Sequence, residues 1–505
     1  MNNNKNDTIL TIEKKLLIYS LSILVGIILY LFILKYLINF DNYILGLTNY
    51  NLEIFKLSWL GIGIIIYCVV TWFLVTKNLF SPYIIFFVFL ILFNFGQCLI
   101  WAIGIHSDTE IGKQNLFSNY PIPSSPEIIK AQLFVCLAIY FFHLGALFCY
   151  KSKKTKKIHF TSSTIFNTKK AMLLVCSIIA LISVPVTLYR TVIDLKVSLE
   201  HGYAAIYYSE FASSTGITMI ISIFFFPSLV GILIGTNYAK KAKVTVYFIL
   251  FIYTILNLFA GDRGSWLYIV IVLVWMHHVF VQKINLKKLL KLSLISLTAL
   301  YFISAIISLR QYGMSNVGYN EFVEAFNLRY FPVFTFVLEM GNSMGIVLIL
   351  LSSGVTWNFS NSYLVSILGM PTTKIPLLFG LDLVLIPNWF SQDYLKITWG
   401  SGFSLFGEAL LNGGIYFAPF IILLIGFFIS TLLFTNKKLD FYSAPLKFFI
   451  ISTSLQSLIG WSRGSSLEYL RNWFRGTIVI VIVIWIIAQI LKKLSSKYSK
   501  RKTLH

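Results

Sequence analysis

The chain has few charged residues, and acidic residues are the scarcest of them. Only 12% of its 505 residues are charged, while 57% are hydrophobic, whereas about a quarter of the residues in soluble domains are charged. The mean hydropathy is +0.79. This composition excludes an ordinary soluble protein and predicts a polytopic membrane protein. No appended soluble domain is expected, so residues 1–505 are predicted to form a single integral membrane domain.

Cysteine is also scarce, and two familiar catalytic signatures are missing. The sequence has no phosphate-binding Gly-Lys-Ser/Thr loop and no zinc-protease helix motif. Two histidines, His106 and His201, fall in predicted outer segments and are expected to be isolated. The cysteines have no paired spacing, so they indicate small core residues and neither a disulfide framework nor a zinc site. The five are Cys68, Cys98, Cys136, Cys149 and Cys176. No cofactor is predicted.

Long apolar segments occupy most of the chain. A segment of about 20 residues crosses the roughly 30 Å of hydrocarbon in a bilayer. The sequence therefore predicts an all-α membrane helix bundle of about 12 spans (11–14). The first segment lacks a cleavage site and is expected to be retained. The predicted spans are residues 15–38, 57–76, 81–105, 128–150, 171–193, 216–238, 244–260, 265–282, 289–309, 404–434, 445–462 and 476–491.

Lysine clusters indicate the orientation of these spans. They lie at the ends of alternate apolar segments, and the positive-inside rule makes those ends cytoplasmic. Both termini are then cytoplasmic, and residues 310–403 form a long loop on the outer side. The net charge of +22 is explained by lysines at the ends of spans, where they set the membrane orientation. No nucleic-acid partner is therefore predicted. The clusters are Lys151 to Lys157, Lys169 and Lys170, Lys240 to Lys243, Lys283 to Lys291, Lys437 and Lys438, and Lys492 to Lys502.

Arginine follows a different pattern from lysine. Of eight arginines, only Arg501 falls on the predicted cytoplasmic side. The planar guanidinium group binds phosphate oxygens through two parallel hydrogen bonds, so the distribution predicts a phosphorylated ligand at the outer leaflet. The alternative is a set of interfacial arginines that reach headgroups or pair with outer acids. The outer arginines are Arg190, Arg263, Arg310, Arg329, Arg463, Arg471 and Arg475.

Two short turns carry the same tripeptide, Arg-Gly-Ser. In the first, Gly261 to Trp266, the glycines permit a reversal and the next helix begins beside Arg263, which suits an anion. The alternative is a plain hairpin in which Asp262 or Ser265 caps that helix. The second turn follows Trp461 and leads to Arg471 and Arg475, which are four residues apart and share a helix face. Such a pair could clamp a diphosphate.

The predicted outer loop, residues 310–403, is expected to contain amphipathic or re-entrant helices. Arg310 opens the loop, and Glu339 interrupts an apolar stretch within it. Its tryptophans, tyrosines and prolines could stack on sugar rings or form an aromatic belt. Beyond the loop, Glu408 enters a membrane segment. An ionisable residue there is a functional candidate, with helix capping or pairing with an arginine as the alternative.

Four motifs in this order resemble the Wzy-type O-antigen and capsular polysaccharide polymerases of bacteria. The resemblance covers roughly residues 240–480, and the amino-terminal half is similar in span pattern only. The motifs are Gly261-Asp262-Arg263-Gly264, Glu339-Met340-Gly341-Asn342-Ser343, the region Tyr363 to Pro371, and Phe403 to Gly414, which includes Glu408 and Asn412.

The resemblance implies a metal-independent membrane glycosyltransferase with a glycosyltransferase-C-like helical fold, similar to the lipid-linked oligosaccharide ligases. Its donor would be a growing glycan on undecaprenyl diphosphate, and its acceptor a lipid-linked repeat unit. The active face would be the periplasmic, outer face of the bacterial inner membrane. The implied partners are these lipid-linked glycans, the bilayer, and a flippase and a chain-length regulator of the same pathway.

The resemblance also implies roles for the residues singled out above. Arginines would bind the diphosphates, and a carboxylate would accept the proton of the acceptor hydroxyl. Two other functions remain open. An O-antigen ligase would share the outer face and the donor, and a lipid-linked oligosaccharide flippase or other transporter would show inverted repeats and polar groups at mid-membrane. The arginines are Arg263, Arg310, Arg329, Arg463, Arg471 and Arg475, and the carboxylates are Asp262, Glu339 and Glu408.

Overall fold

All the regular elements in the described part of the chain are helices, which confirms the all-α prediction. Two isolated bridges, Ile111 with Gln114 and Leu116 with Tyr120, are the exceptions. The computed structural model describes residues 3–152, 162–201, 216–260, 262, 264–284, 287–288, 290–291, 294–298, 301–302, 318–326, 332–354, 361–435 and 444–502.

The helices of the described residues are, in chain order, α1 (Asn3–Ile38), α2 (Phe40–Leu45), α3 (Tyr50–Thr76), α4 (Pro82–Trp101), α5 (Ser125–Ser152), α6 (Ser162–His201), α7 (Gly216–Ile223), α8 (Phe225–Gly235), α9 (Lys240–Ala260), α10 (Ser265–Phe280), α12 (Tyr319–Ala325), α13 (Pro332–Met340), α14 (Ser343–Ser352), α15 (Ser362–Gly369), α16 (Lys374–Leu378), α17 (Ile386–Asn388), η3 (Trp389–Tyr394), α18 (Leu405–Leu432), α19 (Pro445–Ile459), η4 (Gly460–Arg463), α20 (Ser466–Trp473), η5 (Phe474–Val479) and α21 (Ile480–Lys502).

Nine helices among these residues are long and apolar enough to cross a membrane. They overlap nine of the twelve predicted spans. Helices α10 and α19 are shorter, and the predicted span 289–309 lies partly outside the described residues, so the count of twelve is not confirmed. The nine are Lys15–Ile38, Tyr50–Thr76, Pro82–Trp101, Ser125–Tyr150, Ile165–His201, Gly216–Gly235, Lys240–Ala260, Leu405–Leu432 and Ser466–Leu494.

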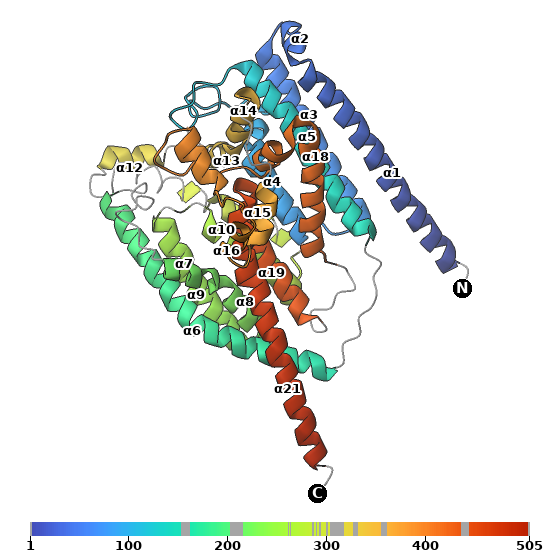
Figure 1. Cartoon of the computed structure of the whole chain (residues 1–505), viewed down its shortest axis with the longest axis vertical. Helices are drawn as coiled ribbons and strands as arrows, with labels where there is room; N and C mark the ends of the chain where they lie inside the picture. Colours follow the sequence, from blue (N-terminus) through green and yellow to red (C-terminus); the bar gives the residue numbers. More distant parts are fainter. Residues whose placement is uncertain are drawn as a thin grey trace.

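Helices α4 and α5 form the centre of the bundle. In their most apolar stretches 78% and 89% of the residues are buried, compared with 11% in α9. Helices α1, α3 and α18 pack against α5, while α6 packs against α8, α9 and α21 on the other side (Figure 1). All five cysteines are buried and free, as predicted. The core is therefore organised around two helices from the amino-terminal half of the chain.

The packing of α5 against α18 depends on two glycines. A Cβ atom at Gly145 would lie 1.9 Å from the carbonyl oxygen of Leu423, and one at Gly426 would lie 2.1 Å from that of Phe142. Small residues let membrane helices bring their backbones together, which increases van der Waals contact where lipid offers no hydrophobic driving force. These glycines fix the depth and register at which α18 lies on α5.

Serine residues set the starting points of α4 and α18. Ser81 accepts a hydrogen bond from the backbone N–H of Ile84, and Pro82 occupies the first helical position. Ser404 accepts hydrogen bonds from the N–H groups of Phe406 and Gly407, both at 3.2 Å. Since α18 begins at a defined residue, Glu408 lies in its first turn.

Within the predicted loop 310–403, the described residues form short helices. Helices α13 and α14 pack on α4 and α5, and residues 343–351 of α14 are all buried. The break between them approaches α4 closely, because a Cβ at Gly341 would lie 2.5 Å from the backbone nitrogen of Gln97. That this segment is an outer loop stays a prediction.

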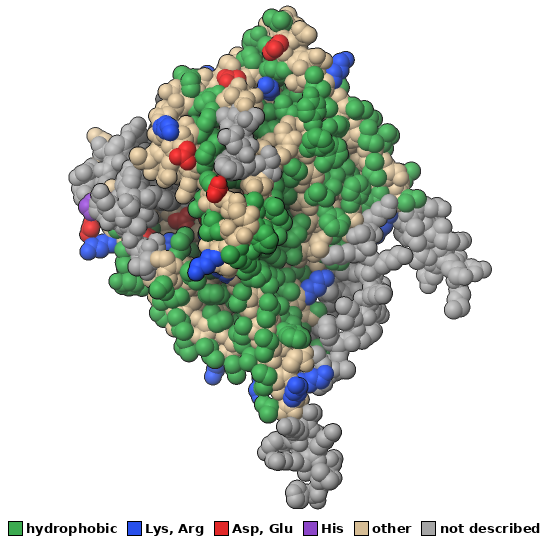
Figure 2. Space-filling view, in the orientation of Figure 1, with side chains coloured by type: hydrophobic (Ala, Val, Ile, Leu, Met, Phe, Trp, Pro, Cys, Tyr) green, Lys and Arg blue, Asp and Glu red, His purple; other side chains and the backbone are tan. Residues whose placement is uncertain are grey.

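The molecular surface is mainly apolar, as a bilayer requires. Figure 2 shows hydrophobic side chains over most of the face in view, with acidic side chains in its upper part and only lysine or arginine near its lower end. Large apolar side chains such as Leu181, Phe417 and Leu424 are more than 60% exposed. The orientation that the lysine clusters indicate stays a prediction.

Candidate active site

Helix α4 supplies polar side chains that hold distant segments together. Asn94 Nδ2 donates a hydrogen bond to the carbonyl oxygen of Ser462 at 3.0 Å, and Ser404 Oγ donates to Asn94 Oδ1 at 2.7 Å. Asn94 thus joins η4 to the residue that caps α18. Gln97 Nε2 donates to the carbonyl oxygen of Leu338 at 3.0 Å and to Asn342 Oδ1 at 2.7 Å. The break between α13 and α14 is fixed to α4 in this way.

Sequence reasoning missed Asn94 and Gln97 as organisers of the site. Both amides are within 1% of complete burial. Buried amides form hydrogen bonds almost without exception. Two amides three residues apart inside an apolar segment therefore indicate hydrogen bonds to other segments. The sequence does not show which residues their partners are.

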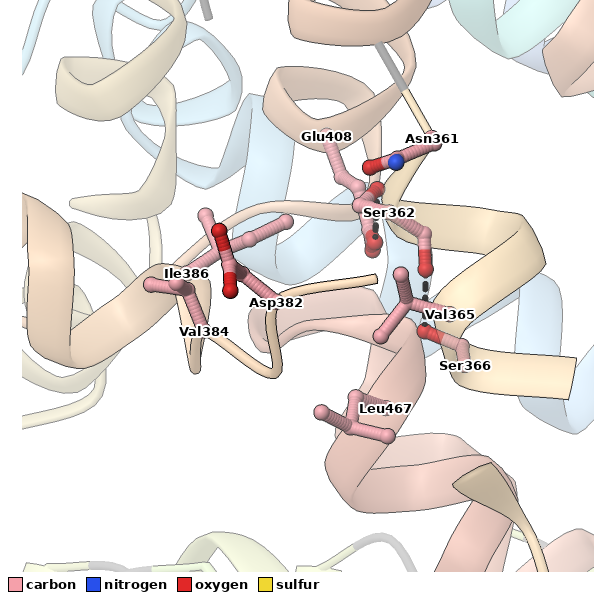
Figure 3. A pocket seen from close by; sticks show the side chains of 9 residues that line it. All are labelled: Asn361, Ser362, Val365, Ser366, Asp382, Val384, Ile386, Glu408 and Leu467. Carbon is pink, nitrogen blue, oxygen red and sulfur yellow. Dashed lines mark hydrogen bonds between the residues drawn. The ribbon is translucent and has the colours of Figure 1, made fainter. Parts of the chain in front are cut away.

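Glu408 is completely buried at the junction of three helices (Figure 3). Ser362 of α15 donates to Glu408 Oε1 at 2.9 Å. Ser466 of α20 donates through its backbone N–H to Oε2 at 2.7 Å and through its hydroxyl to Oε1 at 2.5 Å. The carboxylate therefore lies at the amino terminus of α20, where the helix dipole favours negative charge. Among the described residues no lysine or arginine forms an ion pair with it.

A small cavity opens beside Glu408 (Figure 3). Its volume is about 10 Å³, close to the minimum that one water molecule needs. A second carboxylate, Asp382, lines it from the loop after α16 and is exposed. Sequence reasoning did not single out Asp382. The full lining comprises Asn361, Ser362, Val365, Ser366, Asp382, Val384, Ile386, Glu408 and Leu467.

The turn from Arg463 to Ser466 links Glu408 to an arginine. At one end, the carbonyl oxygen of Arg463 accepts a hydrogen bond from the N–H of Phe403 at 3.2 Å. At the other end, Ser466 binds Glu408. The guanidinium group of Arg463 lies 5.9 Å from the ring centroid of Phe93, in cation–π geometry, and its side chain is exposed. A buried carboxylate and an exposed cation thus flank one four-residue turn.

Asp262 lies near this turn and caps α10. Its Oδ1 accepts from the N–H groups of Gly264 at 3.0 Å and Ser265 at 3.4 Å, and its Oδ2 accepts from the Ser265 hydroxyl. Capping by Asp262 belongs to the hairpin that was the alternative to an anion site at this turn. Tyr268 and Tyr469 each lie within electrostatic range of both Asp262 and Arg463. Asp262 and Arg463, about 200 residues apart in the chain, therefore both lie near these two tyrosines.

Several buried polar groups around this turn have no hydrogen-bond partner in the described part of the molecule. They are the Tyr363 hydroxyl, the Ser465 hydroxyl and Arg471 Nε. Burial and the neighbouring Glu408 raise the pKa of Tyr363 well above its usual value, so its phenol keeps its proton. An unsatisfied buried polar group costs about 1–3 kcal/mol, and such groups often mark functional sites.

The remaining predicted residues divide into two groups. Arg471 and Arg475 are partly buried and lie within electrostatic range of each other, as their spacing predicts, and Glu468 lies near Arg471. Glu339 is partly buried at the end of α13, on the α4 side of the site. Three predicted diphosphate ligands fall outside the described residues: Arg263, Arg310 and Arg329.

One expectation about histidine is wrong. His106 is not isolated, because its Nδ1 lies 3.1 Å from Glu110 Oε1. His201 lies 4.0 Å from a carboxylate oxygen of Glu200. Glu110 follows His106 by four residues, but the connecting segment is a loop, in which that spacing predicts no contact.

Comparison with known proteins identifies the family. The family model described as "O-antigen polysaccharide polymerase Wzy" matches residues 6–495, nearly the whole chain. A comparison with curated proteins found no match, and neither did a comparison with solved structures. The match extends through the amino-terminal half, which contains none of the four motifs and where the resemblance rested on the span pattern only. The chain therefore belongs to the Wzy family of O-antigen polysaccharide polymerases.

Proposed function

We propose that this protein polymerises undecaprenyl-diphosphate-linked oligosaccharide repeat units into O-antigen or capsular polysaccharide, on the outer face of the bacterial inner membrane and without a metal ion. Family membership supports polymerisation in general. One observation carries the assignment of the site. The turn from Arg463 to Ser466 has Glu408 bound at one end and the Arg463 guanidinium group at the other.

The reaction is a glycosyl transfer in which one bond forms and one breaks. A hydroxyl oxygen of the acceptor repeat unit attacks the anomeric carbon of the donor glycan. The bond from that carbon to the lipid diphosphate breaks, and the diphosphate leaves with the electron pair. The acceptor proton passes to a carboxylate acting as general base. Arginines stabilise the charge that develops on the departing diphosphate, so the chemistry requires no Lewis acid.

Residue roles follow from this scheme. Arg463, Arg471 and Arg475 bind diphosphate, together with Arg263, Arg310 and Arg329. The general base is one of Glu408, Asp262 and Glu339. We favour Glu408, because it lines a cavity together with a second carboxylate, Asp382. That cavity is too small for a sugar, so a bound glycan has to displace the loop that carries Asp382.

The test of function uses a strain lacking the gene and follows glycan length on gels. Loss of long chains, with single repeat units still attached to the envelope, is the expected result. Full polymer accumulating on the carrier lipid would identify a ligase. Repeat units retained on the cytoplasmic side would identify a flippase.

Arginine variants test the site. Arg463→Lys, Arg263→Lys and Arg310→Lys are each expected to lower chain extension more than tenfold at normal protein level, since a charge-assisted phosphate bond contributes about 1.5–3 kcal/mol. Arg501→Lys, in the carboxyl-terminal tail, is the matched control and should extend chains normally. Full activity in any one of the three removes that arginine from the proposed site.

A further inference from the structure

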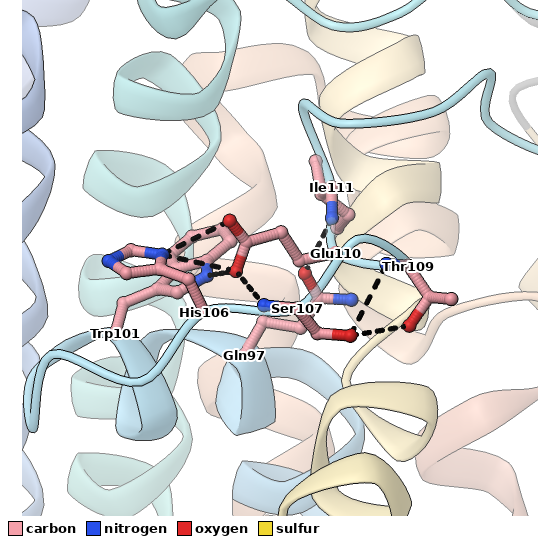
Figure 4. Close-up of polar contacts among 7 residues, drawn as sticks. All are labelled: Gln97, Trp101, His106, Ser107, Thr109, Glu110 and Ile111. Atoms are coloured by element: carbon pink, nitrogen blue, oxygen red, sulfur yellow. Dashed lines mark hydrogen bonds and ion pairs between the residues drawn. The ribbon is translucent and has the colours of Figure 1, made fainter. Parts of the chain in front are cut away.

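The loop between α4 and α5, residues 102–124, contains a histidine held by a buried carboxylate (Figure 4). Glu110 is 4% exposed. Its carboxylate accepts hydrogen bonds from the indole N–H of Trp101 at 2.8 Å and from the backbone N–H of Ser107 at 3.3 Å. The third partner is His106, whose Nδ1 lies 3.1 and 3.2 Å from the two carboxylate oxygens.

The contact with Glu110 fixes the orientation of the imidazole ring. An ionised carboxylate only accepts hydrogen bonds, so the hydrogen in this contact is assigned to Nδ1. Nε2 is then the ring nitrogen left to bind a ligand, and it accepts a hydrogen bond when the ring is neutral. Figure 4 shows that nitrogen pointing away from Glu110, and the His106 side chain is 62% exposed. The loop therefore presents an oriented ring nitrogen at the surface.

This loop is tied to the same face of α4 that organises the candidate active site. Gln97 Oε1 accepts from the N–H of Ile111 at 2.9 Å, so one side chain fixes both the loop and the break after α13. Asn94, which binds Ser462, and Trp101, which binds Glu110, are seven residues apart on that face. Seven residues of helix rise about 10 Å. Glu110 and His106 are held roughly that far along α4 from the Arg463 turn.

This separation decides the role of His106. With about 10 Å of helix between the two groups, the imidazole is assigned no part in accepting the proton of the attacking hydroxyl. Its ligand would then be one of the sugars that follow the reacting one in a diphosphate-linked glycan. Sugar hydroxyls donate hydrogen bonds to imidazole nitrogens, and a ring already fixed by a buried carboxylate loses little conformational entropy on binding.

We propose that His106, positioned by Glu110, is a sugar-binding residue that accepts a hydrogen bond from a hydroxyl of the repeat unit beyond the reacting sugar. This inference rests on the proposed function, because the ligand is the glycan of the same lipid-linked substrate. It adds a specificity-determining contact outside the arginine and carboxylate residues. Glu110 acts as a positioning residue, since its carboxylate is buried and reaches the glycan only through the imidazole.

The test measures chain extension by the full-length protein in liposomes. The substrate is the lipid-linked repeat unit extracted from cells that lack the polymerase. His106→Ala is expected to raise KM about threefold to tenfold, the effect of one lost hydrogen bond, and to change kcat less than twofold. His106→Gln, which keeps an acceptor, should recover most of the affinity. Thr109→Ala is the control, because Thr109 bonds to Ser107 and not to Glu110.

Competition experiments separate the glycan from the diphosphate. The free repeat-unit oligosaccharide, released from its lipid by mild acid, should inhibit His106→Ala about threefold to tenfold more weakly than the unaltered protein. Undecaprenyl diphosphate should inhibit both equally. An unchanged KM in His106→Ala overturns the proposal, as does a hundredfold fall in kcat at constant KM, which would assign the imidazole to the chemical step. The Arg463 variants decide the diphosphate site independently of these results.

Discussion

Glu408 and Glu110 are two buried carboxylates that the fold treats in different ways. Both accept a hydrogen bond from a backbone N–H group, of Ser466 and Ser107 respectively, and neither pairs with a lysine or arginine among the described residues. Glu408 is enclosed by donors from α15 and α20 and joins three helices. Glu110 instead supports an exposed imidazole.

Glu408 holds the backbones of three helices in place, whereas Glu110 orients a functional group at the surface. Neutral donors stabilise a buried carboxylate without a cation if enough of them converge on it. At Glu408 those donors are structural, so the carboxylate determines how α18, α15 and α20 meet. At Glu110 one donor is a side chain with a second polar atom facing outward. The effect of altering each carboxylate should follow this distinction.

The largest effect is expected at Glu408. Glu408→Ala leaves the buried N–H and hydroxyl of Ser466 and the hydroxyl of Ser362 without their acceptor. The free energy of unfolding should fall by about 3 kcal/mol or more, since each unsatisfied buried group costs about 1–3 kcal/mol. Thermal unfolding of the purified protein in detergent measures the loss, and chain extension should be abolished.

Two milder variants distinguish the structural role of Glu408 from its proposed role as general base. Ser362→Ala removes one donor and should lower the free energy of unfolding by about 1 kcal/mol. Glu408→Gln keeps the shape of the side chain but removes its basicity. Normal chain extension by a folded Glu408→Gln protein would exclude Glu408 as the proton acceptor.

A smaller effect is expected at Asn94, which connects the Glu408 side of the site to α4. Asn94→Leu has a similar volume and removes the hydrogen bonds to Ser462 and Ser404, so the free energy of unfolding should fall by about 2 kcal/mol. Chain extension should fall with it. The effect of His106→Ala on KM should be the same in this background, because contacts that share no partner add independently.

If Asn94→Leu and His106→Ala prove strongly non-additive in KM, the two regions are coupled through α4 more tightly than their separate hydrogen bonds require. Val88→Leu, at an exposed position of the same helix, is the control for a change in side-chain volume on α4. It should leave both unfolding and chain extension unchanged.

Much of the fold could be predicted from the sequence because the bilayer imposes it. Apolar length predicted nine segments that the structure forms as helices long and apolar enough to cross a membrane. The predicted spans 265–282 and 445–462 correspond in the structure to shorter helices, of 16 and 15 residues. Hydropathy cannot separate a short buried helix from a span when its neighbours, and not lipid, cover its apolar side chains.

The site was predictable in its residue types but not in its contacts. The order of motifs pointed to Asp262 and Glu408, and the distribution of the arginines pointed to Arg463. The structure brings Glu408 to the turn that begins at Arg463. The organising role of Asn94 and Gln97 was not predictable, since each binds partners more than 200 residues away. The pairing of His106 with Glu110 depends on the conformation of a loop, which carries no periodic signal.

The smallest effect is expected at Trp101, which donates a hydrogen bond to Glu110. Altering Trp101 tests whether His106 keeps its orientation when Glu110 is held less firmly. Trp101→Phe keeps an aromatic ring in the core and removes one 2.8 Å hydrogen bond, so the free energy of unfolding should fall by about 1 kcal/mol. Glu110 keeps the N–H of Ser107, but its carboxylate gains freedom, and the imidazole is less well oriented. KM for the lipid-linked repeat unit should rise about twofold, less than for His106→Ala, because the imidazole itself remains. Trp485→Phe, at an exposed position of α21, should change neither quantity. A KM in Trp101→Phe equal to that of the unaltered protein would mean that His106 holds its orientation without a fixed Glu110.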